Sequence, residues 1–505
     1  MVYSHYERLS ALDATFLAVE DNNAHMHVGA VALFDAAPLT GADGFIDMDR
    51  IRRVVEVGLH RVPRYQQRLA TIPVFGYPVW IDDERFNLNY HVRHVRLPQP
   101  GTERSLKRLA GRVMSQQLDR GKPLWELWVV EGLEGNRVAL ITKAHHCMID
   151  GVGSVELTGA LMRMTPDIER QLSDPPRWLP RPAPTPSQLL MGELRRRASE
   201  PLAAVGAVRQ AIADPRGTLG ALSEAVLGVG EAIGAGLQPA SATPLNTDIG
   251  PHRRFDWLDM PLDAFKEVKT RLGGTLNDIV LATVSGALGR FLHARGLQVE
   301  QLDFRAMIPV NVRSQADRES LGNRIAMMVA RLPLAERDPR VRLQRVSETT
   351  RELKGSRQAL GVKTLEEISD WTLTTLFSAF VRLSTMSRPY NVVVTNVPGP
   401  QYPTYFLGAP TQAVYPLVPL NRGQALGIAL FSYNGSLFWG FNADWDAVPD
   451  LHELVEAVKK EHELLCSAAA QGPLVVSKDQ RALPAVRGRR RARRRGAGLG
   501  KGMGE

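Results

Sequence analysis

Hydrophobic and polar positions in the first half of the chain alternate between two kinds of pattern. Short apolar runs at 26–35 and 136–146 have the length and composition of strands. Between them, the segment IRRVVEVGLHRV at 51–62 places apolar residues every three to four positions, which is typical of an amphipathic helix. The alternation predicts an α/β or α+β fold for this half.

The second half repeats this alternation. Its apolar patterns predict strands at 253–262, 304–313, 391–398 and 427–444, and helices at 263–273, 276–295 and 449–468. The tetrapeptide YNGS, inside the last of these strand regions, has the composition of a hairpin turn between two strands. The chain therefore contains two αβ halves.

A different composition separates the two halves. Six prolines in the segment 174–187 interrupt regular structure. Residues 188–242 are rich in Ala, Leu, Gly and Arg, which predicts crossover or surface helices, and the amphipathic part at 189–205 either packs on its own protein or rests on a membrane. The predicted organisation is an N-terminal domain at 1–165, a Pro-rich linker with crossover helices at 166–250, a C-terminal domain at 251–470 and a basic tail at 471–505.

Composition and charge limit the class of protein. The chain has 505 residues, of which 44% are hydrophobic and 23% charged, as in ordinary globular proteins. Its net charge of +9 is concentrated in a tail with seven arginines between Arg487 and Arg495, which could contact anionic lipid, bind nucleic acid nonspecifically or remain solvated. No basic and aromatic pattern accompanies the tail, so no specific nucleic-acid partner is expected. Two distant cysteines and no apolar leader or spanning segment predict a cytoplasmic location.

The segment AHHCMIDGVG carries the strongest candidate chemistry. His145 and His146 follow an apolar strand, so their side chains are expected to point to opposite faces. One histidine would then be free to act as a base while the other anchors the strand. Asp150 would hold the turn or fix a histidine tautomer, and Gly151 permits a sharp exit from it. On spacing alone, a purely structural cluster explains these residues equally well.

A metal site is not expected. The divergent side chains of His145 and His146 disfavour shared coordination of one ion. His25 and His27 would share one strand face, but no clear carboxylate or cysteine accompanies them. Packing at a strand end is the favoured interpretation of that second pair.

The segment HHCMIDG matches the HHxxxDG motif of the coenzyme A-dependent acyltransferase superfamily. The surrounding chain resembles one family within it, the bacterial wax ester synthase/diacylglycerol acyltransferases, through seven ordered matches between about residues 8 and 465. These are RLSALDATFLAVE, MHVGAVALFD, PLWELWVVEGL, NDIVLATVSGALGRFL, RAMIPVNVR, LGNRIAMMVARLPL and TNVPGP. The resemblance implies two chloramphenicol-acetyltransferase-like domains with a tunnel at their interface.

The resemblance also implies a reaction and the residues for it. His146 would be the general base, with His145, Asp150 and Gly151 completing the catalytic motif. A long-chain acyl group would pass from acyl-CoA to diacylglycerol or to a fatty alcohol, with acyl-CoA as a substrate and no cofactor. The residues expected to contact substrate are Asn277, Asp278, Asn396 and Trp125, although a capping box already explains much of Asp278. The insolubility of the acceptors predicts peripheral contact with a membrane or lipid droplet.

Three alternatives remain at this stage. Cys147 could be an acylated nucleophile beside His146, but adjacent strand residues diverge, which makes direct activation awkward. The protein could instead bind lipid surfaces with little turnover. It could also be a condensing acyltransferase with a different acceptor.

Overall fold

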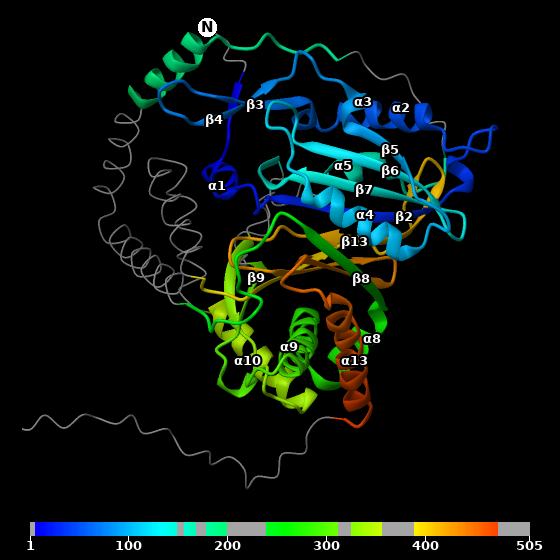
Figure 1. Ribbon diagram of the computed structural model, residues 1–505, viewed down its shortest axis with the longest axis vertical. Coiled ribbons are helices and arrows are strands. Elements are labelled where there is room, and N and C mark those ends of the chain that lie inside the picture. The colour runs from blue at the N-terminus through cyan, green and yellow to red at the C-terminus, as the bar shows by residue number, and fades with distance from the viewer. Residues whose placement is uncertain are drawn as a thin grey trace, which may run out of the picture.

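The structure, a computed structural model, describes residues 6–148, 156–167, 178–198, 239–311, 325–355 and 388–472. These residues form two mixed six-stranded sheets and one small three-stranded sheet. Helices cover the far side of each large sheet, so that the two sheets lie toward the middle of the molecule (Figure 1). The mixed α/β fold predicted from the sequence is confirmed.

The first large sheet has the strand order β12-β13-β2-β7-β6-β5. Its strands are β2 (His27–Asp35), β5 (Val92–Arg96), β6 (Trp125–Leu133), β7 (Arg137–His145), β12 (Tyr405–Phe406) and β13 (Ala409–Leu417). β2 and β7 pair antiparallel along their whole length, from His27 opposite His145 to Asp35 opposite Arg137. This pairing confirms both apolar runs predicted as strands in the first half.

The second large sheet has the order β10-β9-β11-β14-β15-β8. Its strands are β8 (Arg253–Pro261), β9 (Arg305–Asn311), β10 (Ile325–Arg331), β11 (Val392–Pro398), β14 (Leu426–Tyr433) and β15 (Ser436–Asp444). Asn434 and Gly435 connect β14 to β15, and both have positive φ, 44° and 83°. Two such residues form the turn whose twist matches that of a hairpin, so the predicted hairpin is confirmed.

One strand crosses between the two halves. β13 lies in the region predicted as the C-terminal domain, yet it pairs antiparallel with β2, with Tyr415 opposite Val31. The first sheet is therefore completed by a segment almost 400 residues further along the chain. Boundaries drawn along the sequence do not separate the two sheets, and the four-part division of the chain remains a prediction.

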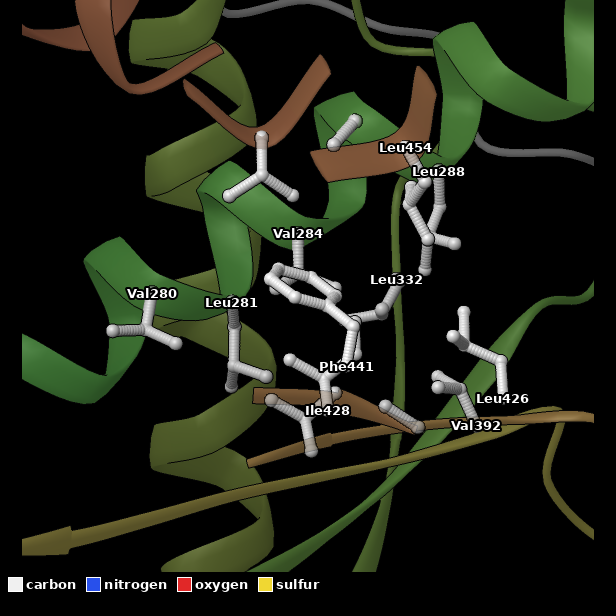
Figure 2. Close-up of a cluster of buried hydrophobic side chains, with 14 of the residues drawn as sticks. Val280, Leu281, Val284, Leu288, Leu332, Val392, Leu426, Ile428, Phe441 and Leu454 are labelled. Carbon is white, nitrogen blue, oxygen red and sulfur yellow. The ribbon is translucent and has the colours of Figure 1, made fainter. Parts of the chain in front are cut away.

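Helix α9 (Leu276–Ala294) forms the centre of the largest core. Its sequence is apolar on nearly all sides, which is the pattern of a fully buried helix. It packs among α8 (Leu262–Leu272), α10 (Pro339–Gly355) and α13 (Leu451–Ala470) on the outer face of the second sheet (Figure 1). Figure 2 shows the contact between the helix and strand side chains, with labels on Val280, Leu281, Val284, Leu288, Leu332, Val392, Leu426, Ile428, Phe441 and Leu454.

Five further helices belong to the first half, and one of them, α4, also contacts β8 of the second sheet. They are α1 (Ala11–Val19), α2 (Met48–Leu59), α3 (Leu88–His91), α4 (Glu103–Ser115) and α5 (Glu156–Leu161). The apolar side of α4 joins residues of β2, β8 and β13 in one core, which ties the two halves together. Among the described residues, no helix is long and apolar enough to cross a bilayer.

The small sheet has the order β1-β4-β3 and lies at one end of the molecule (Figure 1). Its strands are β1 (Tyr6–Arg8), β3 (Gln67–Thr71) and β4 (Pro78–Asp82). Part of the predicted linker is attached to it. The guanidinium of Arg181 donates to both carboxylate oxygens of Asp82, at 2.9 and 2.8 Å, and a helix at 186–198 follows.

Candidate active site

His145 and His146 lie at the end of β7, where the strand passes into the 3₁₀ turn η3 (His146–Met148). The backbone N–H of His145 donates to the carbonyl of Leu124 at 2.9 Å, and that of His146 donates to the carbonyl of Met26 at 2.8 Å. Neighbouring strands therefore fix the backbone of both residues. Their rings contact different parts of the protein.

The ring of His145 is buried and holds the turn that follows it. Its Nδ1 accepts a hydrogen bond of 3.1 Å from the backbone N–H of Cys147. A nitrogen that accepts a hydrogen bond carries no proton, so this bond assigns the ring proton to Nε2. Nε2 lies 3.6 Å from a carboxylate oxygen of Glu20. One hydrogen bond therefore ties the ring of His145 to the turn that carries His146, and the carboxylate of Glu20 lies beside the other ring nitrogen.

Glu20 is the main residue of this cluster that the sequence interpretation missed. It caps the C-terminal end of α1, and its side chain is only 1% exposed. One oxygen accepts from Arg120 at 2.5 Å, and the other lies 3.7 Å from Nε2 of His27. Burial raises the pKa of Glu20, but His145 and Arg120 outweigh it and bring the pKa down to about 2. An acidic residue directly after an apolar helical run was the only signal in the sequence.

His25 and His27 belong to the same buried region. Nε2 of His25 lies 2.9 Å from the carbonyl oxygen of Asn22, and Nε2 of His27 accepts from the backbone N–H of Leu118 at 3.4 Å. Burial holds the pKa of His27 well below its usual range, so this ring is neutral. Within the ranges that the structure describes, no group of His, Cys, Asp and Glu side chains has the arrangement of a metal site.

The ring of His146 has a different environment. It stacks on Phe16 of α1, with ring centroids 4.0 Å apart and planes 26° apart. Nδ1 is buried and makes no hydrogen bond with any residue in the described part of the chain. Burial lowers the pKa of His146 to about 4. The imidazole is therefore neutral at pH 7 and retains a lone pair that can accept a proton.

Cys147 is poorly suited to act as a nucleophile. Its side chain is 2% exposed, and burial raises the pKa of its thiol well above the usual value. The thiolate is the reactive form of cysteine, and burial in apolar surroundings suppresses it. The structure therefore favours a packing role for Cys147.

For three of the predicted site residues, the structure does not test the predicted role. Asp150 and Gly151 lie outside the described residues. Trp125 begins β6 and is 1% exposed, its indole N–H donates to the carbonyl of Tyr65 at 2.7 Å, and its ring stacks on His91 at 4.6 Å. Trp125 packs as a core residue in this conformation, and its predicted contact with substrate remains a prediction.

Asp278 forms the capping box of α9. Its carboxylate accepts from the backbone N–H of Thr275 at 2.8 Å and from the hydroxyl of Thr350 at 2.6 Å, and it is 3% exposed. These bonds give Asp278 a structural function, as the capping pattern in the sequence indicated. A contact of Asp278 with substrate stays a prediction.

Asn277 and Asn396 are both half-buried. Asn277 lies in the first turn of α9, and Asn396 lies in β11 opposite Leu430 of β14. Neither side-chain amide makes a hydrogen bond with another described residue, so both have free hydrogen-bonding capacity. Their contact with substrate stays a prediction.

Comparison with known families identifies the chain. A family model described as the wax ester synthase/diacylglycerol acyltransferase catalytic domain matches residues 9–280, and the model of the C-terminal domain of the same family matches residues 321–465. The chain belongs to this family. The resemblance read from the ordered motifs is thereby confirmed.

Individual members of this acyltransferase family match the sequence of this chain along most of their length. A Mycobacterium tuberculosis protein provisionally named as a diacylglycerol O-acyltransferase is 32% identical, over 88% of this chain and 87% of its own. The O-acyltransferase WSD of Acinetobacter baylyi is 30% identical, over 90% of this chain and 96% of its own.

Solved structures agree with the family fold. The wax ester synthase/diacylglycerol acyltransferase from Marinobacter aquaeolei VT8 matches with a TM-score of 0.65 and 25% identity, over 92% of this chain and all of that one. The first condensation domain of the CDA synthetase matches with a TM-score of 0.56 at 16% identity, over 92% of this chain and 97% of that one, which shows a shared fold. The predicted two-domain architecture of the acyltransferase superfamily is confirmed, whereas the tunnel between the domains stays a prediction.

Proposed function

We propose that the protein is an O-acyltransferase that moves a long-chain acyl group from acyl-CoA to diacylglycerol, and also to fatty alcohols. The names of its relatives support this reaction class. The observation that carries the proposal is the state of His146, a neutral ring at a fixed strand end with a buried Nδ1 that has no partner among the described residues. A neutral imidazole keeps one unprotonated ring nitrogen, and the lone pair of that nitrogen is what a general base needs.

The proposed reaction forms a C–O bond and breaks a C–S bond, and one proton passes from the acceptor oxygen to the leaving sulfur. The acceptor hydroxyl oxygen attacks the thioester carbonyl carbon while the ring of His146 takes the hydroxyl proton. The tetrahedral intermediate then expels the coenzyme A thiolate, which receives the proton from His146 and leaves as a thiol. His146 returns to its neutral form, so the ester and free coenzyme A are the only products.

The neighbouring residues have supporting functions in this proposal. His145 and Glu20 hold the turn of His146, and Asp150 and Gly151 belong with these histidines to the catalytic motif. Asn277 and Asn396 contact substrate through their free amides. We propose that the reaction occurs at the surface of a membrane or lipid droplet on the cytoplasmic side, since both acceptors are insoluble in water.

Acyl transfer from labelled palmitoyl-CoA tests the function directly. The purified full-length protein should produce labelled triacylglycerol from diacylglycerol and labelled wax ester from hexadecanol, and each product should require protein and acceptor together. If the protein forms no product with either acceptor, the proposal is wrong. That result would instead indicate a lipid-binding protein without catalysis or a condensing enzyme with another acceptor.

The pKa of His146 leads to a second prediction, on the pH dependence of activity. A base works in its neutral form, so activity is lost as the pH falls through its pKa. An unperturbed histidine of pKa 6.5 would be only roughly one tenth neutral at pH 5.5. His146, with a pKa of about 4, would be almost wholly neutral there. We therefore expect kcat/KM to change little between pH 7.5 and 5.5, with the acid limb near pH 4 to 5.

The pH profile needs a check on folding. Circular dichroism at each pH separates loss of the base from acid unfolding. An acid limb with its midpoint between pH 6 and 7, in protein that remains folded, would show that the ring of His146 is not desolvated in the way the structure indicates.

A further inference from the structure

The outer end of the molecule carries a helix, at 186–198, that is firmly attached to the small sheet. Leu189 is buried with Ile72, Val79 and Ile81 of the hairpin β3–β4. The helix backbone comes closest to β1 at Gly192, where a Cβ would lie only 2.3 Å from the hydroxyl of Tyr6. The helix is therefore a fixed part of this end of the protein.

One charged residue adds to this attachment. The carboxylate of Glu193, 1% exposed, pairs with Arg8 of β1 and with Arg196 and Arg197 of its own helix. Burial raises the pKa of Glu193, but the arginines outweigh it and lower the pKa to about 2. Leu189 and Glu193 are four residues apart, so they define the side of the helix that faces the sheet.

The opposite side of the helix is apolar and exposed. Met191 and Leu194 are 50% and 45% exposed, although both are large hydrophobic residues. They are three residues apart and therefore lie on one face of the helix. Arg195 follows on the same face, is exposed, and makes no ion pair with any other described residue. The helix thus presents two apolar side chains beside a cation that pairs with no other residue in the described part of the chain.

The tip of the hairpin β3–β4 adds a third exposed apolar residue next to the helix. Val74 is 89% exposed and has a φ of 69°, in the left-handed region that β-branched residues rarely adopt. The guanidinium of Arg197 lies 3.9 Å from the ring centre of the adjacent Phe75, so the tip and the helix are direct neighbours. Figure 1 shows both elements at the same outer end of the molecule.

We propose that Val74, Met191 and Leu194, together with Arg195, Arg196 and Arg197, form a docking surface for an anionic lipid layer. The three exposed apolar side chains belong to two neighbouring elements at this outer end, the helix and the hairpin tip, and exposed apolar side chains of this kind can insert among lipid headgroups. Arg195 makes no ion pair with another described residue, and the three arginines around Glu193 outnumber its single negative charge. This end of the protein therefore carries net positive charge that is complementary to lipid phosphates.

The docking surface is connected to the candidate active site by a short path along the chain. β1 ends at Arg8 and α1 begins at Ala11, so only two residues separate the small sheet from the helix whose Phe16 stacks on His146. Docking would therefore hold the wall of the active site close to the lipid layer that contains the acceptor. This consequence rests on the proposed function, whereas the docking itself does not.

Vesicle flotation of the full-length protein tests the docking surface. The vesicles are phosphatidylcholine alone and phosphatidylcholine with phosphatidylglycerol, both in 0.5 M salt so that the charge of the arginine tail is screened. The triple variant V74S/M191S/L194S should partition onto the mixed vesicles at least tenfold more weakly than the wild type. The matched control F45S removes another large hydrophobic residue, 55% exposed on a different loop, and should stay within twofold of the wild type.

A second variant tests the charged part of the surface. R195Q/R197Q, assayed at 0.1 M salt, should lose most of the preference for mixed over neutral vesicles that the wild type shows. Circular dichroism should be measured on each variant, and only folded variants are compared. Flotation of the folded triple variant equal to that of the wild type would overturn the proposal. So would a dimer seen by sedimentation in the wild type and absent in the triple variant, because the surface would then bind a second copy.

Activity assays separate this proposal from the proposed function. The triple variant should retain acyl transfer to a water-soluble short alcohol and lose transfer to diacylglycerol in vesicles. If the wild type transfers acyl groups to neither acceptor but floats better than the triple variant, the docking proposal stands and the proposed function fails.

Discussion

Replacement of His146 by alanine should lower kcat for acyl transfer by about two to four orders of magnitude, the usual contribution of a general base. The same loss is expected with diacylglycerol and with hexadecanol, because the proton leaves an acceptor hydroxyl in both reactions. KM should change little, since the ring acts on the proton and its removal leaves the remaining contacts with acyl-CoA in place. Steady-state rates with palmitoyl-CoA measure both parameters.

Two further variants make this result specific. His146→Asn keeps a planar polar side chain near the stacking partner Phe16 but provides no base, so it should be as inactive as the alanine variant. Cys147→Ala changes the adjacent buried residue and should keep most of the activity. An active His146→Ala protein would contradict transfer assisted by His146. An inactive but folded Cys147→Ala protein would contradict direct transfer and would favour an acylated cysteine.

The largest effect on stability is expected for Glu20→Gln. The side chain is 1% exposed, and its pKa of about 2 lies well below the 4.5 of an unperturbed glutamate. The folded state therefore favours the ionised carboxylate, and loss of that charge should lower the free energy of unfolding by about 2 to 3 kcal/mol at pH 7. Urea unfolding of both proteins at constant temperature measures the difference.

The matched control is Glu7→Gln. Glu7 also pairs with an arginine, Arg64 at 2.7 Å, but its side chain is 63% exposed. Exposed pairs contribute little, so this variant should lose less than about 1 kcal/mol. Equal losses for Glu7→Gln and Glu20→Gln would show that burial of the Glu20 cluster has no special importance.

The pH dependence provides an independent test of the same cluster. A carboxylate whose pKa is depressed on folding stabilises the protein above its unfolded pKa, and this contribution is lost as the pH falls toward the folded pKa. The stability difference between wild type and Glu20→Gln should therefore be full above about pH 5 and shrink progressively between pH 4.5 and 2. Glu20→Gln should also lower kcat more than it raises KM, because Glu20 contacts the histidine that holds the turn of His146.

Local sequence patterns predicted several helices, strands and turns correctly, because these elements form through interactions between residues that are close in the sequence. The apolar runs that became β2 and β7, the apolar helix α9 and the Asn434–Gly435 turn each depend on residues within a few positions of one another. The family also followed from short motifs read in order. Asp150 and Gly151 belong to the best of those motifs, and their placement lies outside the described residues.

The contacts around the candidate site depend on residues far apart in the chain. Glu20 and His145 are 125 positions apart and meet because the end of α1 packs beside the end of β7. No periodicity in the sequence encodes that meeting. The same is true of the pairing of β13 with β2, because nothing in the sequence of β13 specifies that neighbour.

The sequence by itself determined the alternation of helices and strands and the family, because these depend on local periodicity and on short motifs, and the resemblance to that family predicts His146 as the base. Only the tertiary structure decided the electrostatic state of that base, since a pKa depends on burial and on charges brought near by folding. It also decided which apolar side chains remain exposed at the outer end of the molecule. Met191 and Leu189 have the same character in the sequence, and only the packing of the helix on the small sheet separates the exposed residue from the buried one.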